Sequence, residues 1–110
     1  MKYAMLVYAK PGSHDLPEAE FAQVMAEYEA LRSEPGYVGS AQLHPPETAT
    51  TLRASDGETL TTDGPFADTK EVFGGYYIFD VSDIDTALAI AGRIPALRLG
   101  DAVEVRPVVE

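Results

Sequence analysis

The chain has 110 residues and a mass of 11.9 kDa, which is enough for one modest core and leaves no room for a second domain. Eighteen Asp and Glu against eight Lys and Arg give a formal charge of -10, which disfavours nucleic acids and anionic membranes as partners. Cysteine is absent, and the apolar N-terminus is too short for a membrane span and lacks a signal-peptide cleavage pattern. We therefore expect one cytoplasmic domain over residues 1–110.

The first part of the chain predicts a strand, a helix and a second strand. Residues 3–9 are apolar on both alternating faces, which is typical of a strand covered on both sides. Pro17 suits a helix start, and an apolar stripe predicts a helix over about 17–33. Residues 37–43 predict a strand that ends before two prolines. The helical stripe comprises Phe21, Val24, Tyr28 and Leu31.

Two threonine-rich segments, 48–54 and 59–62, predict a β-hairpin. They flank Ser55-Asp56-Gly57-Glu58, in which Asp-Gly is the preferred centre of a type I′ turn. With a two-residue turn, Ser55 faces Glu58, Arg53 faces Leu60 and Thr50 faces Asp63. Alternation along the strands then places Arg53 and Asp63 on opposite faces, so we expect no ion pair between them.

A charged loop over 63–71 separates the hairpin from the third long strand. Its charged side chains are Asp63, Asp68, Lys70 and Glu71. Residues 73–81 are apolar on both faces and are expected to lie beside 3–9. Ser82 and Asp85 resemble a capping box for a second helix that ends before Pro95. Its apolar stripe is Ile84, Ala87, Leu88, Ala91 and Ile94, and the last strand is indicated by Val103, Val105 and Val108-Val109.

The order β-α-β, hairpin, β-α-β predicts an α+β fold of the ferredoxin-like kind, with both helices on one face of an antiparallel sheet. Two helices cover only that face, although the strands 3–9 and 73–81 are apolar on the other face as well. An exposed patch of this kind indicates a partner surface. We expect a homodimer with the two sheets packed face to face and a cavity between or beside them.

Asp63 and His44 are the candidate catalytic residues. A carboxylate in a partly dry cavity can act as a general base, and histidine is the residue type that titrates nearest neutral pH. Each residue also has a structural interpretation. Asp63 precedes Gly-Pro and suits an Asx turn, and His44, at the end of a strand, suits an exposed position on the sheet rim.

Four further residues are candidates for substrate binding. Arg53 and Lys70 can hold an anionic group, or they can balance the surplus of carboxylates around them. Tyr8 and Tyr76 can line a cavity with a hydroxyl, or they can contribute buried aromatic area. No tight pair such as His-x-x-x-His is present, so we expect neither a metal nor another cofactor.

Several of these segments together resemble the DGPF branch of the YCII-related family. The matching segments are Thr48–Arg53, Thr62–Phe66, Thr69–Glu71, Gly74–Tyr77 and Val103–Val108. The resemblance implies a dimeric α+β barrel of ferredoxin-like subunits. In the wider family a His-Asp pair is proposed as catalytic, and some members are lyase-type enzymes acting on chlorinated aromatic compounds. The predicted first helix, however, has no histidine between Phe21 and Leu31.

Our leading hypothesis is a protein that binds a small organic molecule beside the 63–71 loop and carries out lyase- or isomerase-type proton transfer without a cofactor. The alternatives are a regulatory protein without catalysis, associated with sigma-factor-linked transcription because some DGPF-branch proteins are encoded beside sigma factors, and a ligand sensor. A buried pocket that contains at least two of His44, Arg53, Asp63 and Lys70 would favour a ligand-binding role over a protein-interaction role.

Overall fold

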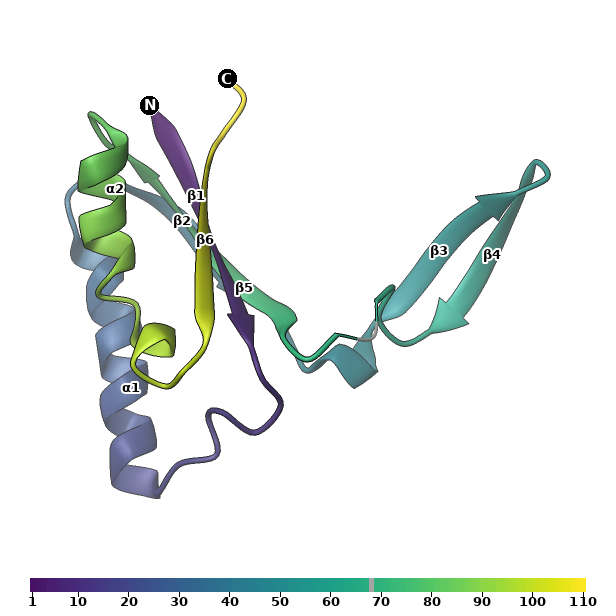
Figure 1. Cartoon of the computed structure of the whole chain (residues 1–110), viewed down its shortest axis with the longest axis horizontal. Helices are drawn as coiled ribbons and strands as arrows, with labels where there is room; N and C mark the ends of the chain where they lie inside the picture. The colour runs from purple at the N-terminus through teal and green to yellow at the C-terminus, as the bar shows by residue number, and fades with distance from the viewer. Residues whose placement is uncertain (68) are drawn as a thin grey trace.

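The computed structural model describes residues 1–67 and 69–110, and its helices and strands follow the expected order (Figure 1). The α-helices are α1 (Glu18–Ala30) and α2 (Ile84–Ala91). The strands are β1 (Lys2–Ala9), β2 (Tyr37–Gln42), β3 (Thr50–Ser55), β4 (Glu58–Asp63), β5 (Val72–Asp80) and β6 (Ala102–Pro107). Three 3₁₀ turns, η1 (Leu31–Ser33), η2 (Pro46–Thr48) and η3 (Pro95–Leu97), complete the described elements.

The main sheet has the strand order β2-β5-β1-β6, and every neighbouring pair is antiparallel. The central strands β1 and β5 correspond to the predicted runs 3–9 and 73–81, and both helices cover the same face (Figure 1). The predicted ferredoxin-like α+β fold is therefore confirmed. None of the described helices is long and apolar enough to cross a bilayer.

The hydrophobic core lies between the helices and one face of the sheet. Met5 from β1 and Phe79 from β5 are completely buried, and Ala87 of α2 packs against the same cluster. The opposite face, which we call the open face, carries the alternate residues of the same strands: Ala4, Leu6, Tyr8, Tyr76 and Ile78, all of them half-buried. No described residue outside the sheet and its loops covers the open face, as the one-sided position of the helices in Figure 1 shows.

The hairpin of β3 and β4 forms a separate two-stranded sheet that projects from the body (Figure 1); we call it the arm. Its register is the predicted one, with Thr50 opposite Asp63 and Arg53 opposite Leu60. Both turn residues have positive φ angles, 49° at Asp56 and 79° at Gly57, as a type I′ turn requires. The Asp-Gly turn in the local sequence therefore accounts for the register of the arm.

The helices differ from the predictions in their ends and buried faces. In α1, Val24 is buried but Phe21 is exposed, and the α-helix gives way to the turn η1 after Ala30. The N-cap of α2 is Asp83, which accepts a hydrogen bond of 2.8 Å from the backbone N–H of Thr86, so the predicted Ser82 capping box is wrong by one residue.

The side of α2 that faces the core also differs from the predicted stripe. The buried residues of α2 are Ala87, Ile90 and Ala91, whereas Ile84 and Leu88 of the predicted stripe are exposed. Two of the three buried residues are alanines, which let the short helix approach the sheet closely.

Buried tyrosines give the core a pH dependence that can be measured. The Tyr77 hydroxyl donates a hydrogen bond of 2.6 Å to the backbone carbonyl of Tyr28, and the two rings stack with centroids 6.4 Å apart. Burial raises the pKa of each phenol to about 12. Because an unfolded tyrosine ionises near pH ~10, the folded state binds more protons than the unfolded state above that pH.

We therefore expect the free energy of unfolding to be fully retained below pH ~10 and to fall as the pH rises toward 12. In the folded protein, absorbance at 295 nm should show two of the six tyrosines ionising near pH 12. Tyr77→Phe should remove one of these late transitions. Ionisation of all the tyrosines in the wild type in one step near pH ~10 would contradict this assignment.

Candidate functional site

An open hollow lies where the arm joins the sheet; we call it the arm-base pocket. It is an open pocket of about 540 Å³, walled by the ends of β1 and β5, the β2–β3 connection and part of the 63–71 loop. Its lining residues are Tyr8, Leu43, His44, Pro45, Pro46, Thr48, Ala49, Pro65, Phe66, Ala67, Thr69, Glu71, Val72 and Phe73. Most of this lining is apolar, so the pocket suits a small organic molecule better than a hydrated ion.

A β-bulge builds the aromatic wall of the pocket. Val7 pairs with Gly75, but the next residue, Tyr8, pairs with Phe73, so Gly74 is the extra residue. The skipped residue moves Phe73 from the core face to the open face, where its ring lies 5.7 Å from that of Tyr8, measured between centroids. Two aromatic rings thereby meet at the mouth of the pocket.

Glycine is also required beside the bulge. A Cβ on Gly75 would lie 2.8 Å from the backbone carbonyl oxygen of Ala41 in β2, which is closer than real Cβ contacts. Gly75 therefore allows the close approach of β2 to β5. The β2–β3 connection is brought to the pocket by this approach.

Hydrogen bonds to backbone carbonyls position the chain segments on two sides of the pocket. The backbone N–H of Gly64 donates to the carbonyl of Ala49 at 2.7 Å, and the Thr51 hydroxyl donates to the carbonyl of Gly64 at 2.7 Å. On the other side, the backbone N–H of Leu43 donates to the carbonyl of Gly74 at 2.9 Å. His44, which follows Leu43, is thus positioned at the pocket by a sheet-type hydrogen bond, even though its side chain is exposed.

The polar groups of the pocket are few and of different kinds. His44 offers an imidazole, Thr48 and Thr69 offer hydroxyls, and Glu71 offers a carboxylate. The Thr69 hydroxyl is already engaged, because it donates a hydrogen bond of 2.5 Å to the carbonyl of Glu71. The arrangement can hold a flat ring between apolar walls and exchange hydrogen bonds or a proton with its substituents.

Comparison with known proteins identifies the family. The YCII-related domain matches residues 1–110. The chain belongs to the YCII-related family. A relative, the uncharacterized protein R00369 of Rhizobium meliloti (strain 1021), is 38% identical over 113 residues, which cover 97% of this chain and 91% of that protein.

A solved structure supports the fold of this YCII-related protein. It is 5-chloro-2-hydroxyhydroquinone dehydrochlorinase (TftG) from Burkholderia phenoliruptrix AC1100 in complex with 2,5-dihydroxybenzoquinone. The two structures have a TM-score of 0.55 over 99% of this chain and 94% of that chain, at 19% sequence identity. At this identity the similarity establishes a shared fold.

Only some of the candidate site residues line the pocket of this YCII-related protein. His44 and Tyr8 line it, and Arg53 reaches its wall indirectly, since its guanidinium lies 4.5 Å from the centre of the Phe66 ring. Asp63, Lys70 and Tyr76 are not lining residues: the first two are exposed, and Tyr76 lies on the open face.

From the sequence, a ligand-binding role would be favoured by a buried pocket that contains at least two of His44, Arg53, Asp63 and Lys70. This criterion is not met, because the pocket is open and, among the residues described, only His44 of these four lines it.

The carboxylate of Asp63 accepts no hydrogen bond from residues 1–67 or 69–110, so the expected Asx turn is not observed there. Lys70 forms no ion pair with a described residue, and the loop carboxylate Asp68 lies outside the described residues. Within the described part of the chain, no group of three or more His, Asp or Glu is placed to hold a metal ion.

Sequence reasoning did not assign Phe66, Phe73 or Glu71 to the pocket. Phe66 was visible as the last residue of the Asp-Gly-Pro-Phe motif, and Glu71 as a loop carboxylate. Phe73 carried no such signal, because its face depends on the bulge at Gly74, which period-two alternation does not reveal.

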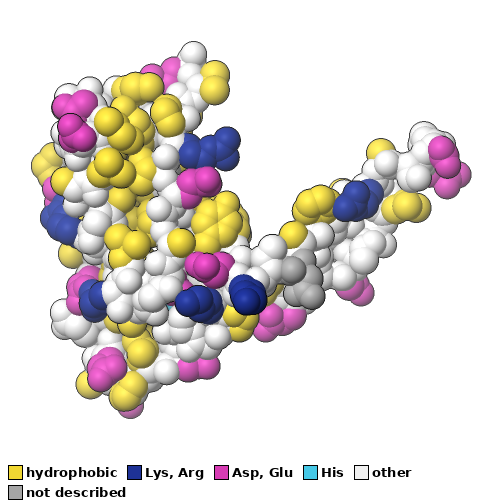
Figure 2. Space-filling view, viewed as in Figure 1, with side chains coloured by type: hydrophobic (Ala, Val, Ile, Leu, Met, Phe, Trp, Pro, Cys, Tyr) yellow, Lys and Arg dark blue, Asp and Glu magenta, His cyan; other side chains and the backbone are white. Residues whose placement is uncertain are grey.

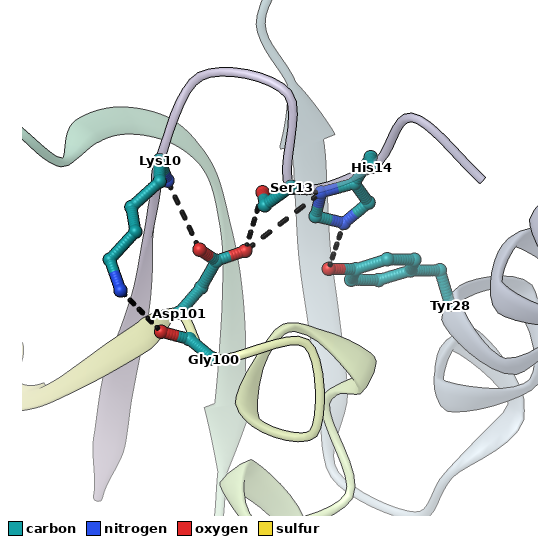
Figure 3. A network of polar contacts seen from close by, with 6 residues as sticks. All are labelled: Lys10, Ser13, His14, Tyr28, Gly100 and Asp101. Atoms are coloured by element: carbon teal, nitrogen blue, oxygen red, sulfur yellow. Dashed lines mark hydrogen bonds and ion pairs between the residues drawn. The ribbon is translucent and has the colours of Figure 1, made fainter.

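A second polar cluster lies away from the pocket, between the β1–α1 loop and the start of β6 (Figure 3). The buried carboxylate of Asp101 accepts hydrogen bonds from the backbone N–H of Lys10 at 3.0 Å and from the Ser13 hydroxyl at 2.8 Å. His14 Nδ1 lies 3.9 Å from the same carboxylate, and His14 Nε2 lies 3.4 Å from the Tyr28 hydroxyl. His14 is half-buried in this network, which ties the β1–α1 loop to the start of β6.

This network predicts a stability effect that is separate from ligand binding. Asp101→Ala leaves the N–H of Lys10 without its acceptor and should lower the free energy of unfolding by about 1–3 kcal/mol. Glu104→Ala is the matched control, because Glu104 is an exposed carboxylate three residues further along the chain, in β6. Urea denaturation followed by circular dichroism measures both. Equal effects of the two substitutions would show that the Asp101 network does not hold the loop.

Proposed function

We propose that this protein binds a small hydroxylated aromatic or quinonoid molecule in the arm-base pocket and that His44 exchanges a proton with it, in chemistry of the lyase or isomerase kind. The supporting observation is the composition of the pocket. An aromatic wall of Tyr8 and Phe73 stands in the same hollow as the imidazole of His44 and the carboxylate of Glu71. Flat apolar surfaces bind a ring, and the two titratable groups act on its substituents.

Glu71 gives the pocket a hydrogen-bond acceptor for a ligand hydroxyl. A phenolic hydroxyl can donate a hydrogen bond to Glu71 while the ring contacts the apolar walls.

His44 is the group in the pocket best suited to move a proton. Imidazole accepts and releases protons near neutral pH, and His44 lies at the mouth of the pocket rather than in the core. In this proposal the imidazole takes the proton of a ring hydroxyl, and the negative charge left on the ring oxygen is delocalised into the ring. Arg53, whose guanidinium lies over the ring of the lining residue Phe66, is a cation that can balance this charge.

The solved structural neighbour supports this class of ligand. TftG was solved with 2,5-dihydroxybenzoquinone, a small hydroxylated quinone. The same molecule is therefore a suitable probe for the arm-base pocket.

The binding part of the proposal is tested with a matched pair of phenylalanines. Phe73 lines the pocket and is 39% exposed, whereas Phe21 is 43% exposed on α1 and is not a lining residue. Phe73→Ala should weaken binding of 2,5-dihydroxybenzoquinone by about threefold to tenfold, the effect of losing one aromatic contact, and Phe21→Ala should leave it unchanged. Isothermal titration calorimetry measures both dissociation constants. Equal affinities for all three proteins would place the ligand elsewhere.

The proton-transfer part is tested with His44→Gln, which keeps a hydrogen-bonding side chain but cannot act as a base at neutral pH. Turnover of a panel of hydroquinones and chlorinated hydroxyquinols, followed by ultraviolet absorbance, should fall by about 100-fold or more in kcat with a smaller change in KM. Unchanged turnover would remove His44 from the mechanism. Tight probe binding without turnover of any compound would indicate a ligand sensor.

A further inference from the structure

The arm-base pocket is larger than one aromatic ring requires. Its volume is about 540 Å³, whereas a cavity of about 150 Å³ is enough to hold a benzene molecule. A single hydroxylated ring would therefore leave more than half of the pocket unfilled. The lining is mostly apolar, and apolar lining that the ligand does not cover adds nothing to its affinity. The size of the pocket indicates a ligand with a second, apolar part.

The titratable groups of the pocket lie together where it meets the main sheet. Tyr8 and Phe73 form a ring pair there, with centroids 5.7 Å apart. A sheet-type hydrogen bond ties the segment that carries His44 to β5, and Glu71 immediately precedes that strand. We call the part of the pocket formed by these four residues the sheet end. A hydroxylated ring meets both an aromatic surface and proton-exchanging groups at this end.

The part of the pocket beside the arm, which we call the arm end, is apolar. Its lining residues are Ala49, Pro65, Phe66 and Ala67, and none of their side chains has a polar atom. Ala49 belongs to this end because its carbonyl accepts a hydrogen bond of 2.7 Å from the N–H of Gly64. The Phe66 ring forms no ring pair with a described aromatic residue. It is therefore a second aromatic surface, separate from the ring pair at the sheet end.

One face of the Phe66 ring is left for a ligand. The Arg53 guanidinium lies over the ring, 4.5 Å from its centre, yet Phe66 is still 71% exposed. Figure 2 shows apolar and cationic side chains exposed together along the arm. Hydrogen bonds from the Gly64 N–H and from the Thr51 hydroxyl hold the backbone two residues before Phe66. An exposed aromatic ring on a backbone held in this way is suited to stack against the ring of a ligand.

We propose that the arm-base pocket takes a molecule with two aromatic rings, in which a hydroxylated ring lies at the sheet end and an apolar ring lies against Phe66 at the arm end. This inference rests on the proposed function, because it assigns the substrate class of the same site. Phenols and quinones that carry an aryl substituent have the required division between a polar and a hydrocarbon ring. The hydroxylated ring exchanges its proton with His44, and the second ring contributes binding area.

Two probes that differ only by the second ring test this substrate class. Hydroquinone has one ring, and 2-phenylhydroquinone has the same two hydroxyls and an unsubstituted phenyl group. Anaerobic isothermal titration calorimetry with the full chain should give a dissociation constant about tenfold lower for 2-phenylhydroquinone, because its phenyl group buries further apolar surface. Equal dissociation constants for the two probes would overturn the inference.

A matched pair of substitutions locates the second ring. Phe66→Ala should raise the dissociation constant of 2-phenylhydroquinone by about threefold to tenfold and change that of hydroquinone by less than about twofold. Leu52→Ala is the control, since Leu52 is a 65% exposed residue of the arm that does not line the pocket, and it should change neither constant. Equal effects of the two substitutions, or an equal loss of affinity for both probes in Phe66→Ala, would overturn the assigned position.

Nuclear Overhauser effects report the orientation of the bound molecule. The phenyl protons of 2-phenylhydroquinone should show contacts with the ring protons of Phe66, and the protons of its hydroxylated ring should show contacts with those of Phe73. The reverse pattern would overturn the assignment of the two ends.

The outcomes separate this inference from the proposed function. Equal affinities for the two probes, both lowered by Phe73→Ala, would overturn the two-ring substrate and leave the proposed function intact. Failure of every probe to bind, 2,5-dihydroxybenzoquinone included, would overturn both.

Discussion

The structure depends on one geometric constraint: two helices cover only one face of a four-stranded sheet. The covered face holds the core around Met5 and Phe79, and the open face presents Leu6, Tyr76 and Ile78 without a described layer above them. The arm adds further exposed surface, because its residues do not pack against the core.

The pocket arises from the same sheet through a local irregularity. The bulge at Gly74 turns Phe73 onto the open face beside Tyr8, and the absence of a Cβ at Gly75 lets β2 approach, which brings His44 to the same place. Phe66 joins this wall to the arm, where Arg53 stacks on it. The pocket and the arm therefore share the Phe66 side chain. Any molecule that covers this side chain changes the exposure of both.

Local rules were sufficient to predict much of the fold from the sequence. The Asp-Gly turn fixed the register of the arm, and two-sided apolar runs identified the central strands β1 and β5. Tertiary effects were not visible: Asp83 rather than Ser82 caps α2, and Phe21 leaves the buried face of α1. The candidate site was found in part, since His44 and Tyr8 line the pocket, but Phe73 required the bulge and Asp63 lies outside the lining. A pattern of residue types indicates which strand a side chain belongs to, whereas its direction near a bulge or loop depends on contacts distant in sequence.

We propose that a second copy of the chain covers surface that the helices leave open, and amide hydrogen exchange in the arm tests this proposal most directly. An uncovered two-stranded hairpin opens constantly, so its amides exchange almost as fast as those of an unfolded peptide. We predict that the inter-strand amides of β3 and β4 are strongly protected at high protein concentration and lose this protection on dilution, while those of β1 and β5 stay protected throughout. Fast exchange of the arm at every concentration would contradict the account.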